Sequence, residues 1–221
     1  MKLLLSALLK YFCGLLLVGL LIFLPAGTLA WSRGWLFMIA LFGPMLIAGF
    51  VMLFRAPKLL QKRLDVKEKQ TAQKGVLALS GLMFLAGFVV AGLDFRFGWS
   101  QMPLPVTIVA TVVFLAAYAL YGEVLRENEW LSRTVKVEEG QSVVDTGLYG
   151  IVRHPMYAVT IWLFLAIPLI LGSWYALIIF AVYPVLILVR LRDEERLLAR
   201  DLPGYRDYQK KVRYRLFPFI W

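Results

Sequence analysis

The residues best suited to chemistry gather in one short stretch, 147–157, directly before a long apolar run. Gly147 and Gly150 flank Tyr149, and a backbone that lacks side chains at those positions can approach a ligand closely. Pro155 suits the first turn of a helix, where backbone N–H groups have no partner inside the helix. The stretch therefore predicts a ligand-binding site at the entrance of a helix.

The same stretch contains His154, which is the only histidine of the chain. An isolated histidine is usually a structural hydrogen-bonding residue, and without companion ligands it does not predict a zinc site. Cys13, the single cysteine, lies inside the first apolar run and predicts neither a disulfide nor a metal site. Because His154 stands beside Arg153 and Tyr157, ligand binding is the favoured interpretation, and no metal is expected.

A second group of charges follows the last apolar run, where Arg190 precedes the adjacent carboxylates Glu194 and Glu195. Arg190 and Glu194 are four residues apart, so on a helix they share one face and can pair. Such charges can simply snorkel at a helix end, but ion pairs at the membrane edge are costly and often functional. Further on, Tyr205 and Tyr208 can stack on a heterocycle or anchor a helix at the interface. Spacing alone leaves these alternatives open.

Membrane helices must position these side chains, because the sequence is strongly apolar. Hydrophobic residues make up 61% of it and the mean hydropathy is +0.74, whereas soluble domains are roughly 45–50% apolar. About 20 apolar residues cross the hydrocarbon core. Pro168 and Pro184 are expected to kink the last region, which Gly172 and Ser173 break into the two arms of a tight helical hairpin. The apolar regions are 9–30, 35–54, 76–94, 104–123 and 155–190.

The distribution of positive charge predicts the orientation. The formal net charge is +10, and with six spans every Lys and Arg except Arg33 and Arg96 falls on one side. Because positively charged loops face the cytoplasm, both termini are expected there. Blocks of charge between apolar runs suit anionic lipid headgroups. No nucleic-acid recognition motif accompanies them, so nucleic acid is not an expected partner.

These observations predict an all-α fold: a polytopic transmembrane helical protein with about six membrane segments, the last two forming the hairpin. A change in composition near residue 123 divides the chain into transmembrane helices, 1–122, and a membrane-embedded region rich in polar, aromatic and charged residues, 123–221. The stretch 57–74 is expected to form an amphipathic helix on the inner surface or a solvated loop. The alternation at 132–137 predicts a short extended piece.

Together, these motifs resemble the isoprenylcysteine carboxyl methyltransferase family, whose superfamily includes phospholipid N-methyltransferases. The resemblance covers residues 120–221 and rests on three strings: Gly147-x-Tyr149-x-x-x-Arg153-His154-Pro155-x-Tyr157, Glu194-Glu195 and Gly204-Tyr205-x-x-Tyr208. It implies a methyltransferase that uses S-adenosyl-L-methionine, releases S-adenosyl-L-homocysteine and lacks a soluble Rossmann domain. The chain indeed has no Gly-x-Gly-x-x-Gly string after a strand.

The resemblance also implies roles for individual residues within a cofactor-binding and catalytic region at 123–221. The implied catalytic residues, which face the acceptor, are Arg190, Glu194 and Glu195. The implied cofactor-binding residues are Gly147, Tyr149, Arg153, His154, Tyr157, Tyr205 and Tyr208. The expected partners are membrane lipids and a lipid-like acceptor, which can be a prenylcysteine carboxylate, a phospholipid amine or a related amphiphile.

Two other functions stay open at this point. An NADPH-dependent membrane reductase of the sterol reductase type carries similar basic and tyrosine motifs near its C-terminus. A non-catalytic membrane scaffold or small transporter is the third alternative, although the spans hold few ionisable residues near their centres. The host membrane is expected to be the bacterial inner membrane or the endoplasmic reticulum, with the site facing the cytoplasm. The sequence leaves the oligomeric state open.

Overall fold

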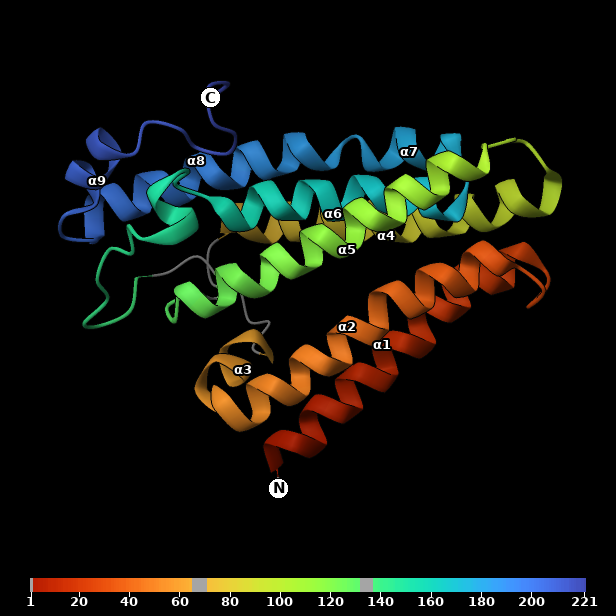
Figure 1. The fold of residues 1–221 in the computed structure, drawn as a ribbon, viewed down its shortest axis with the longest axis horizontal. Coiled ribbons are helices and arrows are strands. Elements are labelled where there is room, and N and C mark those ends of the chain that lie inside the picture. The colour runs from red at the N-terminus through yellow and green to blue at the C-terminus, as the bar shows by residue number, and fades with distance from the viewer. Residues whose placement is uncertain (1, 65–70, 132–136) are drawn as a thin grey trace.

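The computed structural model describes residues 2–64, 71–131 and 137–221 (Figure 1). Within these ranges the chain forms helices and no strands, which confirms the predicted all-α fold. The extended piece expected at 132–137 lies, except for its last residue, outside the described residues. The helices are α1 (Lys2–Ala26), α2 (Ser32–Arg55), α3 (Pro57–Leu64), α4 (Thr71–Phe97), α5 (Leu104–Glu127), η1 (Gly147–Gly150), α6 (Pro155–Leu171), α7 (Trp174–Phe180), α8 (Tyr183–Asp201) and α9 (Tyr205–Lys211).

Five helical segments of the described chain are long and apolar enough to cross a membrane. They are Leu3–Ala26, Ser32–Arg55, Lys74–Phe97, Leu104–Glu127 and Trp174–Asp201. The apolar helix α6 is shorter, with 17 residues. The predicted apolar regions are therefore helical, while the number of six spans stays a prediction.

The connections rich in Lys and Arg share one end of the bundle. Figure 1 shows α3, α9 and the residues that directly precede η1 at this end, and the turns α1–α2, α4–α5 and α6–α7 at the opposite end. We call the first end the charged end. This arrangement is the one that the positive-inside pattern requires, and the cytoplasmic location of the charged end stays a prediction.

The predicted hairpin is formed by α6 followed by α7 and α8. Gly172 ends α6 with φ +84°, in the left-handed region that favours glycine. The Ser173 hydroxyl then accepts a hydrogen bond from the Ala176 N–H at 3.0 Å and caps α7. Pro168 lies inside α6, whereas Pro184 lies in the first turn of α8, directly after the break between α7 and α8. A proline cannot donate the backbone hydrogen bond of a helix interior, which explains that break.

A buried carboxylate holds the hairpin turn against α4. Asp94 accepts hydrogen bonds from the backbone N–H of Ser100 at 2.7 Å and from its hydroxyl at 2.6 Å. The Ser173 hydroxyl also donates to Asp94. Because a buried carboxylate needs such donors, this cluster fixes the start of α7 at the end of the bundle opposite the charged end.

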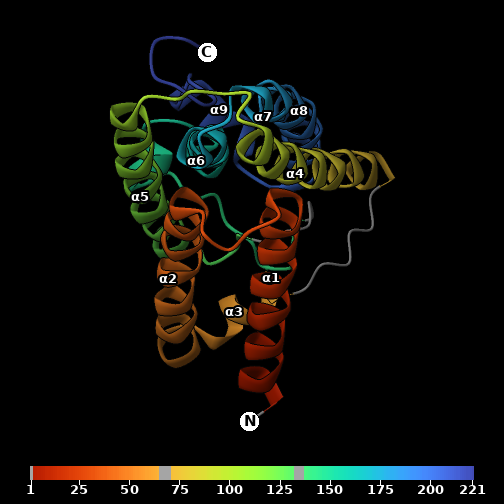
Figure 2. The same cartoon turned by 90° about the vertical axis from the view of Figure 1, so that its right-hand side faces the viewer.

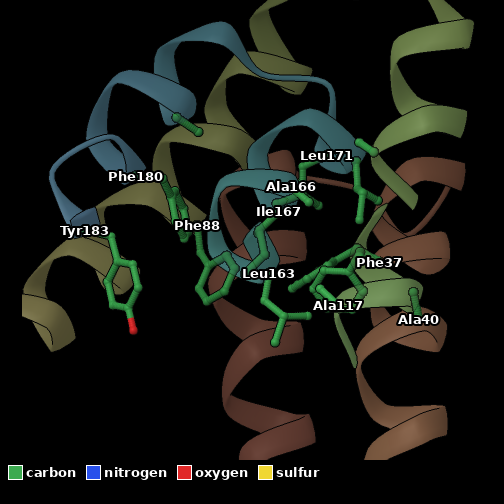
Figure 3. Packing of buried hydrophobic residues seen from close by; sticks show 14 of the residues in the cluster. Phe37, Ala40, Phe88, Ala117, Leu163, Ala166, Ile167, Leu171, Phe180 and Tyr183 are labelled. Carbon is green, nitrogen blue, oxygen red and sulfur yellow. The ribbon is translucent and has the colours of Figure 1, made fainter. Parts of the chain in front are cut away.

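Aromatic rings fill the interface between α4 and the hairpin. Phe84 packs edge-on against Phe164 and Phe180, with ring centroids 4.8 and 5.5 Å apart. Phe88 and Phe180 belong to the same core, which Figure 3 shows together with buried residues of α6. In Figure 2, α6 lies between α5 and the group formed by α4, α7 and α8. This core sets the position of α6 and α8, which carry the candidate site.

We expect Gly87→Val to destabilise this interface. A Cβ at position 87 would overlap the ring of Phe180, and overpacking of a filled core lowers the free energy of unfolding by about 1–3 kcal/mol. Thermal denaturation of the detergent-purified protein measures the effect. Gly81→Val is the control, because a Cβ on Gly81 meets no atom within 4 Å. Equal midpoints for the two variants would contradict the packing described above.

Candidate functional site

A polar cavity opens at the charged end. It lies between the first turn of α6, the second half of α8, and α9. It encloses about 820 Å³ of empty space, including the space open to solvent at its mouth. Its wall also includes η1 and the segment after α5, through Tyr149, Asn128 and Trp130. Side chains from both ends of the region 123–221 therefore meet around one space.

A carboxylate from the end of α5 holds the turn that carries Tyr149. Gly147 begins η1 with φ +49°, in the region that favours glycine. The Glu127 carboxylate accepts a hydrogen bond from the Leu148 N–H at 2.9 Å, and a Cβ at position 147 would overlap this carboxylate. Glycine is therefore needed here so that Glu127 can reach the backbone and fix Tyr149.

We expect Gly147→Ala to lower the free energy of unfolding by about 1–3 kcal/mol, because a side chain there is strained by φ and displaces Glu127. The midpoint of thermal denaturation reports this change. In Gly122→Ala the new Cβ on α5 meets no described atom within 4 Å, so that variant should be at least as stable as the unmodified protein. A Gly147→Ala variant as stable as Gly122→Ala would show that Glu127 does not hold η1.

Glu195 is the centre of a buried ion network. Its carboxylate accepts hydrogen bonds from Nε of Arg153 at 2.7 Å and from Nε of Arg215 at 2.9 Å, and Nε2 of His154 lies 3.3 Å away. Glu195 and Arg153 are each 7% exposed. Since a buried charge is tolerated only when it is paired and hydrogen-bonded, the network joins the start of α6 to α8 and to the C-terminal tail.

The C-terminal tail runs alongside the start of α6. The backbone N–H groups of Arg153 and His154 donate to the carbonyls of Tyr214 and Arg215, each at 2.9 Å. The Arg153 guanidinium also donates to the Val212 carbonyl at 2.7 Å. These bonds occupy backbone groups that precede α6 and keep the tail on the bundle.

Tyr157 joins Arg190 and Glu194, the two charged residues that are predicted to share one face of a helix. Nε of Arg190 donates to the Tyr157 hydroxyl at 3.0 Å, and this hydroxyl donates to the Glu194 carboxylate. All three side chains line the cavity. Tyr157 and Arg190 are buried, whereas Glu194 is half-buried. This set can orient an anionic group through the guanidinium and accept a proton at the carboxylate.

Three further tyrosines form an aromatic part of the wall. Tyr208 donates to the backbone carbonyl of Tyr149 at 2.7 Å, and the Tyr205 hydroxyl lies 3.4 Å from Nε2 of His154. Burial raises the pKa of Tyr149, Tyr205 and Tyr208 above the usual range of a phenol. All three therefore stay protonated at neutral pH and can donate hydrogen bonds.

The Tyr149 hydroxyl differs from the other two because it is buried without a hydrogen-bond partner among the described residues. The Asn128 side chain lies near this hydroxyl and lowers the pKa of Tyr149, against the larger rise that burial causes. Both residues line the cavity. A buried donor without a partner is rare in proteins, so this hydroxyl is suited to a ligand.

Helix α3 contacts residues in and beside the cavity wall. Nζ of Lys62 pairs with Glu138 at 2.7 Å and lies 5.2 Å from the centroid of the Trp130 ring. The Glu138 N–H donates to the side chain of Gln141 at 2.9 Å, and both Trp130 and Gln141 line the cavity. Of the two alternatives expected for 57–74, a helix is present at Pro57–Leu64, and it contacts the site from the N-terminal half of the chain.

The structure brings eight of the ten predicted site residues to the cavity wall. They are Tyr149, Arg153, His154, Tyr157, Arg190, Glu194, Tyr205 and Tyr208. Gly147 and Glu195 are not among the lining residues and instead support neighbours that are. The roles of all ten in binding or catalysis stay predictions.

Several contributors to the site are not among the ten predicted site residues. Glu127 and Arg215 hold the turn and the ion network, and residues 141–144 line the cavity. Only their charge could have indicated Glu127 and Arg215 in the sequence, because neither residue lies at a fixed spacing from the residue that it contacts. Gln141 and its neighbours carry no signal that separates a cavity wall from an ordinary loop.

These features define an integral membrane protein with several long apolar helices and a polar cavity at its charged end. Residues 106–200 match the model of the isoprenylcysteine carboxyl methyltransferase (ICMT) family. The match confirms the resemblance that the C-terminal motifs predict and implies a membrane methyltransferase. It includes most of the cavity wall but ends before Tyr205 and Tyr208. A comparison with curated proteins gave no match.

Proposed function

We propose that the protein is an S-adenosyl-L-methionine-dependent methyltransferase that acts on a lipid-like acceptor at the cytoplasmic face of its membrane. The observation that carries the proposal is the group formed by Tyr157, Arg190 and Glu194 on the wall of a partly aromatic cavity. This group lies within the residues that match the methyltransferase family. The host is the bacterial inner membrane or the endoplasmic reticulum.

The residues of the cavity fit a cofactor with a heterocyclic base, sugar hydroxyls and a positively charged sulfur. The rings of Tyr205 and Tyr208 lie 5.7 Å apart and offer faces on which a base can stack. The buried Tyr149 hydroxyl is a donor without a described partner, which suits a polar group of the ligand. Glu194 places negative charge on the wall, which favours a cation nearby.

When bound, S-adenosyl-L-methionine would supply a methyl group on a sulfonium for in-line displacement and yield S-adenosyl-L-homocysteine. Arg190 would orient a carboxylate acceptor, such as that of a prenylcysteine, which is already ionised at neutral pH. Glu194 would accept the proton that an amine acceptor, such as that of a phospholipid, must lose. Tyr157 would hold both side chains through its hydroxyl.

Glu195 is better suited to positioning than to proton transfer. Its carboxylate already accepts hydrogen bonds from Arg153 and Arg215, and it does not line the cavity. Arg153 in turn contacts Glu195 and the Val212 carbonyl. A nicotinamide cofactor with a 2′-phosphate would need an arginine for that phosphate, so the engagement of Arg153 favours the methyltransferase over the reductase.

Calorimetric titration of the detergent-purified protein with S-adenosyl-L-homocysteine, and separately with NADPH, tests the proposal. We expect saturable binding of the homocysteine compound and no binding of NADPH. Binding of NADPH alone would favour the reductase. Binding of neither compound by protein with a cooperative thermal transition would favour the scaffold and contradict the proposal.

We expect Tyr149→Phe to weaken binding of S-adenosyl-L-homocysteine by about fivefold to tenfold, the size of one lost hydrogen bond. The protein should keep its stability, since the hydroxyl has no described partner to lose. Tyr208→Phe is the contrasting variant. The Tyr208 hydroxyl donates to the Tyr149 carbonyl, so loss of this hydroxyl should lower the midpoint of thermal denaturation. Unchanged affinity in Tyr149→Phe would remove this hydroxyl from the ligand site.

A further inference from the structure

A second cavity lies between α1 and α2 and is bounded on one side by α3, and none of its described lining residues lines the polar cavity. Figure 2 shows α3 between the ends of α1 and α2 that lie near the N-terminus. The cavity holds about 940 Å³ of empty space, including the space open to its surroundings. Side chains such as Leu8, Leu46 and Leu53 make its wall mainly apolar.

The wall leaves room for a chain-like apolar molecule. A Cβ on Gly49, which lines the cavity, would meet no atom within 4 Å. Leu4, Met45 and Phe50 line the cavity and are exposed. Each lies in a helix long and apolar enough to cross a membrane, so these exposed side chains would contact lipid. Apolar cavities do not bind water well, and the apolar molecules present in a bilayer are the acyl chains of lipids.

The rim of the same cavity is positively charged. Lys10 and Arg63 both line it. Nζ of Lys10 donates to the Leu64 carbonyl at 2.6 Å, and an ammonium group has three donors, so among the described residues this bond uses only one of them. The Arg63 guanidinium lies over the Tyr121 ring, 5.4 Å from its centroid. Two cations from α1 and α3 thus stand at the charged end of an apolar cavity, and the lining residues that the structure describes include no carboxylate.

We infer that this cavity binds one anionic phospholipid of the inner leaflet. An acyl chain would lie between α1 and α2, and the phosphate would lie between Lys10 and Arg63. Lipids of the cytoplasmic leaflet carry negative charge, and each nearby Lys or Arg strengthens their binding. Because α3 also contacts Glu138 and Trp130 through Lys62, the bound lipid would support a helix that contacts the wall of the polar cavity. The inference does not depend on the proposed methyltransferase activity.

Native mass spectrometry of the full-length protein in detergent, titrated with phosphatidylglycerol or phosphatidylcholine, tests this site. We expect one molecule of phosphatidylglycerol to bind several-fold more tightly than phosphatidylcholine. Lys10→Gln and Arg63→Gln should each weaken phosphatidylglycerol binding by about fivefold, the effect of one removed charge. Gly49→Phe should abolish binding of both lipids by filling the cavity.

Two matched variants control for indirect effects. Lys58→Gln removes a charge from an exposed position of α3, and Gly81→Phe adds a ring on α4 where a Cβ meets no atom within 4 Å. Neither should change lipid binding. Equal affinity for the two lipids, or equal losses in Lys10→Gln and Lys58→Gln, would overturn the anionic site. Unchanged binding in Gly49→Phe with a normal thermal midpoint would overturn the cavity as its location.

Discussion

Replacement of Glu194 by glutamine should lower methyl transfer by about 100-fold or more while leaving the protein folded. The Glu194 carboxylate lines the polar cavity and accepts a hydrogen bond from Tyr157. Glutamine keeps the shape and an acceptor oxygen but removes the negative charge and the ability to take a proton. Transfer of a labelled methyl group to membrane lipids, measured beside the midpoint of thermal denaturation, separates activity from stability.

Asp193→Asn is the matched control for this prediction. Asp193 precedes Glu194 on α8 but pairs with Arg196 and does not line the cavity. The control should therefore retain the activity of the unmodified protein. Comparable losses in Asp193→Asn and Glu194→Gln would show that the charge of this helix segment matters rather than the carboxylate on the cavity wall. Full activity in Glu194→Gln would remove Glu194 from the reaction.

The second large effect is expected at Glu195 and concerns stability. Glu195→Ala leaves the buried Arg153 guanidinium without its carboxylate partner, and loss of one member of a buried ion pair lowers the free energy of unfolding by about 3–5 kcal/mol. The midpoint of thermal denaturation in detergent should fall by many degrees. A fall in activity would follow from this instability, because Arg153 and His154 line the cavity.

Arg215→Ala provides the contrast for Glu195. The Arg215 side chain is 35% exposed, so water can replace much of its interaction with Glu195, and the Glu195–Arg153 pair remains. Its midpoint should therefore fall much less than that of Glu195→Ala. If the two variants lose similar stability, or if Glu195→Ala is as stable as the unmodified protein, the network does not anchor the start of α6.

The sequence predicts most of the fold because membrane spans have a strong signal. Runs of about 20 apolar residues mark α1, α2, α4 and α5, and Gly172 marks the end of α6 in the left-handed conformation that glycine favours. The sequence does not mark the end of the second arm of the hairpin. It continues through Arg190 to Asp201, because a helix that leaves the apolar region need not end where the hydrophobic residues do.

The candidate site is only partly readable from the sequence. Residues with motif spacing, such as Arg153 and Tyr157, are placed together by the first turn of α6. The distinct placements of Glu194 and Glu195 follow from helix geometry, since adjacent residues point about 100° apart on a helix of 3.6 residues per turn. The sequence does not indicate which of the two faces the cavity. Contacts such as that between Glu127 and Leu148 depend on tertiary structure and have no local pattern.

The most direct test of the central claim is methyl transfer itself. Protein reconstituted in liposomes that contain phospholipid amines and a prenylcysteine would be incubated with S-adenosyl-L-methionine labelled in its methyl group, beside the Glu194→Gln variant. We predict label in one lipid-like product and at most a trace with the variant. Saturable binding of the cofactor without label in either acceptor would leave another amphiphile to be found among extracted membrane lipids. Absence of label from every lipid fraction, with folded protein and bound cofactor, would contradict a methyltransferase acting on lipid-like acceptors.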